Sequence, residues 1–170
     1  ENCQSVIYRN GAADFALTPD DIAALPFPDF DALVVTGTAL AAEPSRAATL
    51  TAMTMARKAG LTTIIDLDYR PYSWPSRGEA QATCLAAARL SDIIVGNDVE
   101  FGLLAGTEAE GLQIARQLVT EGAAIAVYKR GELGAITLAP DTEFATGIYR
   151  TKALKPTGAG DAFLGGFLVA

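Results

Sequence analysis

Hydrophobic residues along this chain fall into short runs separated by longer amphipathic stretches. Runs of strand length occupy residues 32–36, 62–67, 92–95 and 124–128. Between and after them, apolar residues recur at helical spacing over residues 44–60, 77–90, 98–105 and 108–121. Strand and helix therefore alternate through most of the sequence, which predicts a mostly parallel sheet with helices on both faces. The predicted fold class is an α/β, three-layer αβα sandwich.

Further strands and helix boundaries can be placed around this alternation. Two strands at residues 134–138 and 143–149 follow the fourth run closely, as in a hairpin or meander at one side of the sheet. Thr18 and Pro19 open a short predicted helix that runs through residue 25, with acids in its first turn. Residues 5–9 read as one more strand.

Several positions are expected to be buried. Residues 32–36 are continuously apolar, which is typical of a strand covered on both faces of a sheet. Residues 162–170 are uniformly apolar and predict a buried helix. Met53 and Cys84 occupy positions within predicted helices, so both are expected in the core.

The composition favours a folded globular chain and excludes several classes of protein. The 170 residues are 50% hydrophobic and 19% charged, which suits one domain with a sizeable core. The net charge of −7 argues against a nucleic-acid partner, because such a surface needs clustered basic residues. Histidine is absent, which excludes histidine triads, general bases and metal ligands. Any metal must then be held by oxygen ligands, as magnesium is.

Cysteine usage and the chain ends bear on location and completeness. Cys3 and Cys84 lie far apart with no C-x-x-C spacing, which predicts a reducing compartment, the cytoplasm. No apolar run reaches the ~20 residues that span a bilayer, so no membrane partner is expected. The chain opens without methionine and stops within a predicted helix. We therefore expect residues 1–170 to be a single core segment of a longer protein, truncated at both ends.

Polar clusters follow four of the predicted strands where each strand ends. In a mostly parallel sheet the carboxyl ends of the strands meet at one edge, and ligands bind outside that edge. The sequence therefore predicts that one rim of the sheet carries the functional site, built from the clusters at residues 37–38, 66–70, 97–100 and 129–131.

The stretch Thr157-Gly158-Ala159-Gly160-Asp161 precedes the last predicted helix. Glycines let the backbone approach a ligand closely, and the N–H groups of a helix N-terminus favour an anion. Asp161 would place a proton acceptor beside that anion, as phosphoryl transfer to a hydroxyl requires. A glycine turn that merely caps a helix explains the pattern equally well. Neither a dinucleotide-binding fingerprint nor a P-loop is present.

Asn97 and Glu100 have the spacing of a capping box, in which each side chain bonds the other residue's backbone N–H. On spacing alone, the capping interpretation is favoured. The functional interpretation is that the two residues order water around a magnesium ion that neutralises phosphate charge.

Residues 66–74 place acids, an arginine and aromatic rings at the end of a strand. Asp68 and Arg70 could form an ordinary local ion pair. The functional interpretation is favoured modestly: Arg70 holds an oxygen of a ligand through its planar guanidinium, and rings of residues 69, 72 and 74 wall a small-molecule pocket.

Lys129, Arg130, Gly131 and Gly134 lie between two predicted strands. They could form a tight hairpin, or the glycines could let a nucleotide lie close to the backbone. The spacing leaves these two interpretations undecided.

Taken together, Gly158-Ala159-Gly160-Asp161 and its companion motifs resemble the ribokinase-like (pfkB-type) carbohydrate kinase family. The resemblance covers nearly the whole chain, and the ordered set of motifs is specific although each motif alone is not. It implies a ribokinase-like αβα fold and an ATP-dependent sugar kinase that uses magnesium.

The resemblance also implies roles for individual residues. Asp161 would be the base that takes the proton from the sugar hydroxyl, and the N–H groups of residues 158–160 would form the anion hole for the γ-phosphate. Asn97 and Glu100 match the N-x-x-E motif that governs magnesium and phosphate, in addition to any capping role. Residues 129–134 match the segment that runs beside ATP.

Within the family, residues 36–40, 66–74 and 154–157 resemble the branch that phosphorylates keto-deoxy sugar acids. The substrate implied first is 5-dehydro-2-deoxygluconate, from inositol breakdown, and the alternative is 2-keto-3-deoxygluconate. Arg70 would contact the acidic sugar, and we assign Asp68 and Thr38 to sugar binding with it.

Two departures from the family pattern stand out. Lys155 and Pro156 replace an Asp-Thr pair that often helps to build a monovalent-cation site, so the resemblance gives no basis for potassium activation. The family's N-terminal part, with its first strands, sugar-covering lid and frequent dimer interface, has no counterpart here, nor do the helices after the G-A-G-D helix. A homo-oligomer is therefore left open. So is the alternative that the segment is a nucleotide-binding scaffold without activity of its own.

Overall fold

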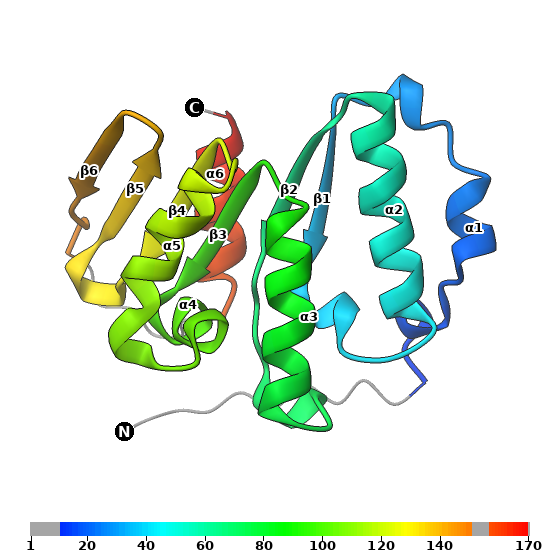
Figure 1. Ribbon diagram of the computed structural model, residues 1–170, viewed down its shortest axis with the longest axis horizontal. Coiled ribbons are helices and arrows are strands. Elements are labelled where there is room, and N and C mark those ends of the chain that lie inside the picture. The colour runs from blue at the N-terminus through cyan, green and yellow to red at the C-terminus, as the bar shows by residue number, and fades with distance from the viewer. Residues whose placement is uncertain (1–10, 151–156, 170) are drawn as a thin grey trace.

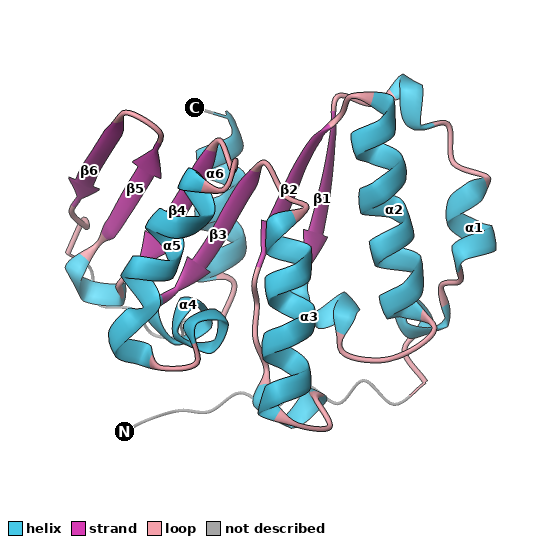
Figure 2. Ribbon diagram, in the orientation of Figure 1, coloured by secondary structure: helices cyan, strands magenta, loops and turns pink. Residues whose placement is uncertain are grey.

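The computed structural model describes residues 11–150 and 157–169, which build one six-stranded sheet with helices (Figure 1, Figure 2). The strands are hydrogen-bonded in the order of the sequence. The first four pair in parallel, and the last two add an antiparallel meander at one side. Their bounds are β1 Ala32–Thr36, β2 Thr62–Asp66, β3 Ile93–Asn97, β4 Ile125–Lys129, β5 Ala135–Ala139 and β6 Thr142–Thr146.

Helices lie on both faces of this sheet, so the prediction of a mostly parallel α/β sandwich is confirmed. In Figure 1, α2, α3, α4 and α5 lie in front of the sheet and α6 (red) lies behind it. The helices are α1 Pro19–Ala23, α2 Ser45–Ala59, α3 Arg77–Arg89, α4 Asp98–Ala105, α5 Gly111–Thr120 and α6 Ala159–Val169. Short 3-10 turns cover Ala13–Ala16, Phe27–Asp29, Gly37–Leu40, Pro71–Ser73, Glu108–Glu110 and Gly131–Leu133.

Local capping signals set several helix boundaries. Thr18 and Asp21 form a complete capping box at the start of α1. Gly60 ends α2 in the left-handed conformation, with φ 81°, that residues with a Cβ adopt at a cost. The helix predicted at 108–121 is divided into a 3-10 turn and α5. The strand predicted at residues 5–9 lies outside the described residues. No helix within the described part of the chain is long and apolar enough to cross a membrane.

The main core lies between the front face of the sheet and helices α2 to α5. Met53 and Phe101 are fully buried there, and Cys84 is 1% exposed. Met53 and Cys84 are thus core residues, as predicted. Burial raises the pKa of the Cys84 thiol to about 12, because the thiolate would be poorly solvated in this apolar layer.

We expect Cys84 to resist alkylation in the native state. At pH 9 its thiol stays protonated and inaccessible, whereas unfolding exposes it and restores an ordinary thiol pKa. Iodoacetamide treatment followed by mass spectrometry of the Cys84 peptide, with and without urea, measures this. Rapid native modification at pH 9 would show that the α3 face opens without global unfolding.

The rear face of the sheet is covered less completely than the sequence predicted. Leu164 of α6 packs on a smaller cluster that contains Ile64, Val95 and Val127. Val34 of β1 is 46% exposed, so the prediction that this strand is covered on both faces is wrong. The physical reason is position, because β1 is the edge strand and α6 lies over β2 to β5.

Helix α6 itself is only partly buried. Leu164 is its one buried residue among those described, whereas Val169 is 89% exposed. The prediction of a buried helix is therefore wrong for the described structure. An apolar composition all round a helix indicates burial only where other elements cover both of its sides, and here the sheet covers one.

Candidate functional site

The last residues of strands β1 to β4 lie next to one another at one edge of the sheet. The register aligns Thr36 with Asp66, and Asn97 with Lys129. The turn into α6 reaches the same edge, at the lower side of Figure 1. The four polar clusters that follow these strands thus meet at one rim, as the sequence predicts.

Lys129 is at the centre of this rim. Its Nζ atom lies 3.6 Å from Asp66 Oδ1, and both side chains are largely buried. The same ammonium lies 5.9 Å from the centre of the Phe163 ring in α6. A methyl group at Gly160 would lie 3.8 Å from Nζ. Lys129 therefore links the carboxyl end of the sheet to the beginning of α6.

Two buried carboxylates share the field of this one ammonium. Burial raises the pKa of Asp66 and the charge of Asp68 adds to this, whereas the charge of Lys129 and the hydrogen bonds from Lys129 and the Asp68 backbone N–H oppose it. Burial likewise raises the pKa of Glu100, against the hydrogen bond from the Asn97 backbone N–H and the charge of Lys129. The sequence places Asp66 in the rim cluster at residues 66–70 but gives it no role of its own. The signal that could have found it is an acid at the end of an otherwise apolar strand, where an unpaired charge would be costly.

Asn97 and Glu100 form the predicted capping box at the start of α4. Glu100 N–H donates to Asn97 Oδ1 over 2.9 Å, and Asn97 N–H donates to Glu100 Oε2 over 2.7 Å. The other carboxylate oxygen, Oε1, accepts from Tyr69 N–H over 3.3 Å. The residue before Asn97 is Gly96, and a side chain there would crowd this arrangement. A Cβ at Gly96 would lie 2.7 Å from Leu67 Cδ1 and 3.3 Å from Glu100 Oε2. The capping interpretation is confirmed, and the magnesium role of the pair stays a prediction.

The described residues contain no group of three or more acidic or cysteine side chains that could hold a metal ion. Glu100 is 5% exposed and each of its oxygens accepts one backbone N–H group, so this side chain fits an indirect role through water better than direct coordination. What fits is a magnesium held mainly by phosphate oxygens and water, with Glu100 supplying charge from behind.

The residues assigned to sugar binding pair with each other or with neighbours. Arg70 Nη2 forms an ion pair with Asp68 Oδ1, and Thr38 Oγ1 lies 2.9 Å from Thr36 Oγ1. Asp68 has φ 27°, a conformation that non-glycine residues seldom adopt and that often marks functional sites. The ion-pair interpretation of Arg70 is thus what the structure shows. The Arg70 side chain is 41% exposed, and its role in sugar binding stays a prediction.

The predicted aromatic pocket wall is wrong for two of its three rings. Tyr69 and Trp74 belong to the main core, at 9% and 8% exposure. The Arg46 guanidinium covers the Trp74 ring at 5.5 Å. Tyr72 is 48% exposed. The sequence could not distinguish these positions, because apolar rings serve equally as core and as pocket walls.

Residues 130–134 form the tight turn between β4 and β5. Arg130 N–H donates to Gly134 O over 2.7 Å, and Gly131 and Gly134 both have positive φ. Arg130 Nη2 also donates to Leu133 O over 3.2 Å. The hairpin interpretation is therefore what the structure shows, and contact with a nucleotide stays a prediction.

The first turn of α6 has the geometry that an anion site requires. Gly158 has φ 85°, and the first helical hydrogen bond runs from Ala162 N–H to Gly158 O. The preceding N–H groups of that turn, from Ala159 onward, have no acceptor within the helix. Asp161 is exposed. Its role as a base stays a prediction, and residues 155 and 156 lie outside the described part of the chain.

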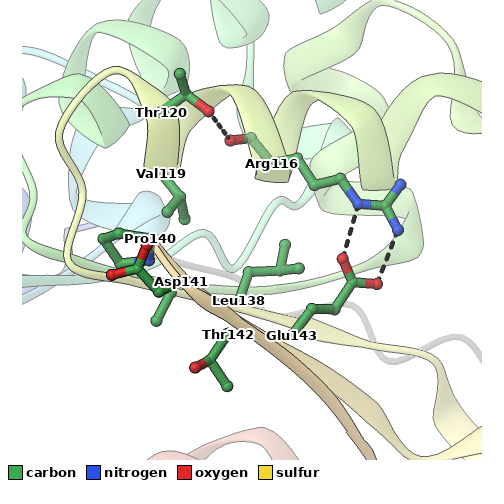
Figure 3. A pocket seen from close by; sticks show the side chains of 9 residues that line it. Arg116, Val119, Thr120, Leu138, Pro140, Asp141, Thr142 and Glu143 are labelled. Atoms are coloured by element: carbon green, nitrogen blue, oxygen red, sulfur yellow. Dashed lines mark hydrogen bonds and ion pairs between the residues drawn. The ribbon is translucent and has the colours of Figure 1, made fainter.

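A separate hollow lies between α5 and the β5–β6 turn (Figure 3). There the Arg116 guanidinium donates to both carboxylate oxygens of Glu143, over 2.9 and 2.8 Å. These two opposite charges therefore neutralise each other. Leu138 lines this hollow and is paired with Ala126, near the beginning of β4, whereas Lys129 is the last residue of that strand. The hollow therefore lies at the end of the strands opposite to the rim. This hollow includes none of the predicted site residues.

The fold and the rim define an α/β protein whose site gathers carboxylates, one ammonium and a helix N-terminus, as expected of an enzyme acting on phosphate groups. Residues 1–170 match the sequence pattern of the family described as pfkB family carbohydrate kinase. The chain therefore belongs to the pfkB family of carbohydrate kinases.

Individual relatives agree with this family. A 5-dehydro-2-deoxygluconokinase of Shouchella clausii is 38% identical over 170 residues, covering 99% of this chain and 52% of the relative. The fructokinase of Vibrio cholerae O395, bound to fructose, ADP and calcium, is 32% identical with a TM-score of 0.77, over 89% of this chain and 48% of that one. An aminoimidazole riboside kinase of Salmonella enterica, complexed with aminoimidazole riboside and an ATP analogue, is 26% identical with a TM-score of 0.81, over 95% of this chain and 53% of that one.

The ribokinase-like α/β fold predicted from the sequence is thereby confirmed. The chain spans about half the length of the curated relatives it matches.

Proposed function

We propose that this chain is the catalytic core segment of an ATP-dependent kinase that phosphorylates the primary hydroxyl of 5-dehydro-2-deoxygluconate. The observation that carries the proposal is the meeting of the α6 N-terminus, Lys129 and the strand-end carboxylates at one rim. The substrate rests on the name of the Shouchella clausii relative, and ATP rests on the ADP and ATP analogue in the titles of the two solved structures.

In this proposal each part of the rim has a task. The N–H groups at residues 158–160 hold the γ-phosphate, and Asp161 takes the proton from the sugar hydroxyl as the new P–O bond forms. Residues 129–134 lie along the nucleotide. Arg70, with Asp68 and Thr38, orients the acidic sugar. Most of the rate then comes from positioning and electrostatics rather than from covalent chemistry by the protein.

Magnesium, when bound, would neutralise phosphate charge, with Asn97 and Glu100 ordering the water around it. Glu100→Gln is expected to raise the magnesium concentration needed for half-maximal turnover by about tenfold, because residues behind metal ligands have effects of this size. Magnesium titrations of both proteins at fixed ATP measure it. An unchanged requirement would leave Asn97 and Glu100 as a helix cap only.

The experiment for the proposed function is ADP release from Mg·ATP with a panel of sugars. The panel contains 5-dehydro-2-deoxygluconate, 2-keto-3-deoxygluconate, fructose and ribose, tested on this chain and on the longer protein that we infer contains it. Turnover with the first substrate alone is the expected result. If 2-keto-3-deoxygluconate were the preferred substrate, the protein would be a 2-keto-3-deoxygluconate kinase, the alternative within the same family.

A function of another class also has a specific observation in its favour. Val34, Leu168 and Val169 leave apolar surface exposed on the rear side of the sheet and of α6, which is typical of a surface that packs against a further protein element. A scaffold that binds nucleotide without turnover would release no ADP with any sugar and would still bind Mg·ATP.

A further inference from the structure

Asp66 is a buried carboxylate at the rim to which the proposed function assigns no role. It ends β2, where the register fixes its backbone between Thr36 of β1 and Val95 of β3. It is 6% exposed, and a carboxylate buried to that degree is costly unless a cation accompanies it. The Lys129 ammonium, 3.6 Å away, supplies that cation.

The other nearby buried carboxylate is already committed to the backbone. Glu100 lies within the electrostatic reach of Lys129, but its two oxygens accept the N–H groups of Asn97 and Tyr69. Asp68, the third acid of the rim, pairs with Arg70. Asp66 is the carboxylate that forms the ion pair with Lys129, and the Asp68 backbone N–H, from which it accepts a hydrogen bond, holds it in place.

The place where Lys129 is held is electrostatically unusual. Its ammonium lies beside Gly160 in the first turn of α6 and over the Phe163 ring. The N-terminus of a helix carries positive partial charge, so a cation placed there is repelled. An anion that binds to both the cation and the helix N-terminus removes this repulsion. Asp66 offsets part of this cost when no anion is bound.

We propose that Asp66 is a positioning residue, which holds the Lys129 ammonium toward the terminal phosphate at the first turn of α6. The inference rests on the proposed function, which places the γ-phosphate at residues 158–160. What it adds is the buried Asp66–Lys129 ion pair, in which Asp66 orients the ammonium. Lys129 would contact the γ-phosphate directly, whereas Asp66 acts only through Lys129.

The test compares binding of Mg·ATP and Mg·ADP to the chain by calorimetry. Lys129→Met should weaken Mg·ATP roughly 10- to 100-fold, the value of a hydrogen bond to a charged group, and leave Mg·ADP nearly unchanged. Asp66→Asn should also weaken Mg·ATP selectively. The double variant should bind Mg·ATP no worse than Lys129→Met, and it removes the Asp66 charge that Lys129→Met alone would leave buried without its ion-pair partner.

Asp92→Asn is the matched control. Asp92 also flanks a strand, accepts the Thr63 backbone N–H over 2.7 Å and lies 3.5 Å from the Arg57 guanidinium, but at the opposite edge of the sheet. This variant should lose stability and keep the ratio of ATP to ADP affinity. If Asp66→Asn weakened the binding of Mg·ATP and of Mg·ADP by the same factor, the ratio of the two affinities would be unchanged, as it is in the control. That result would overturn the positioning role.

A second measurement does not depend on nucleotide. Acetylation of Lys129 by acetic anhydride, followed by mass spectrometry, should be slow in the unmodified chain and faster in Asp66→Asn, because the ammonium is released from its partner. Unchanged labelling contradicts the proposal. If the unmodified chain binds neither nucleotide, the proposed function fails and the role of Asp66 with it. If it binds Mg·ATP and Asp66→Asn binds it equally well, only the role of Asp66 fails.

Discussion

Replacing Asp161 with asparagine is expected to lower turnover about 10²- to 10⁴-fold, the usual contribution of a positioned general base, with little change in Mg·ATP affinity. The reason is chemical rather than structural. Asp161 is exposed in the first turn of α6, so an isosteric amide there disturbs no packing. What it removes is the group that accepts the proton from the sugar hydroxyl.

The measurements are steady-state turnover of the longer protein with 5-dehydro-2-deoxygluconate and calorimetric binding of Mg·ATP. Asp141→Asn serves as the control, since Asp141 is also an exposed acid but lies in the β5–β6 turn beside the separate hollow. It should leave both quantities unchanged. If Asp161→Asn weakens Mg·ATP binding as much as turnover, Asp161 is not the base.

Replacing Gly134 with alanine is expected to lower the free energy of unfolding by on the order of 3 kcal/mol, a substantial part of the roughly 5–15 kcal/mol by which folded domains are stable. Gly134 has φ 79° and ψ −142°, a combination open in practice to glycine alone. A Cβ there would also lie 1.9 Å from the backbone oxygen of Thr146, so β4, β5 and β6 would have to separate.

Gly131 in the same turn gives a matched comparison. It too has positive φ, at 55°, but a Cβ there would meet nothing within 4 Å. Gly131→Ala should therefore cost only about 1 kcal/mol, the penalty of a left-handed conformation. Urea unfolding of the three proteins measures both values. Equal losses for the two variants would mean that the close approach of Gly134 to β6 does not hold the meander together.

Elements whose ends carry local signals could be predicted from the sequence. Thr18, Gly60 and Asn97 each mark a helix boundary through hydrogen bonds or a backbone conformation that depend on a few neighbouring residues. The meander followed from three strands in quick succession. The common rim followed from the rule that parallel strands end at the same edge.

Features that depend on distant partners could not be predicted. The coverage of Val34 and Val169 depends on which elements lie over the rear face, which no local pattern encodes. Trp74 belongs to the core because it packs in a cluster of side chains that are distant in the sequence, and Arg46 of α2 lies over its ring. The pairing of Asp66 with Lys129 could not be predicted, because the two residues end strands that are two positions apart in the sheet.

The measurement that tests the central claim most directly is an NMR titration of the isotope-labelled chain with Mg·ATP and with Mg·ADP. If the first turn of α6 holds the terminal phosphate, the amides of residues 158–160 should shift with Mg·ATP and much less with Mg·ADP, while residues 130–134 respond to both. Shifts gathered instead around Arg116 and Glu143, with residues 158–160 unmoved, would contradict a phosphoryl-transfer site at this rim.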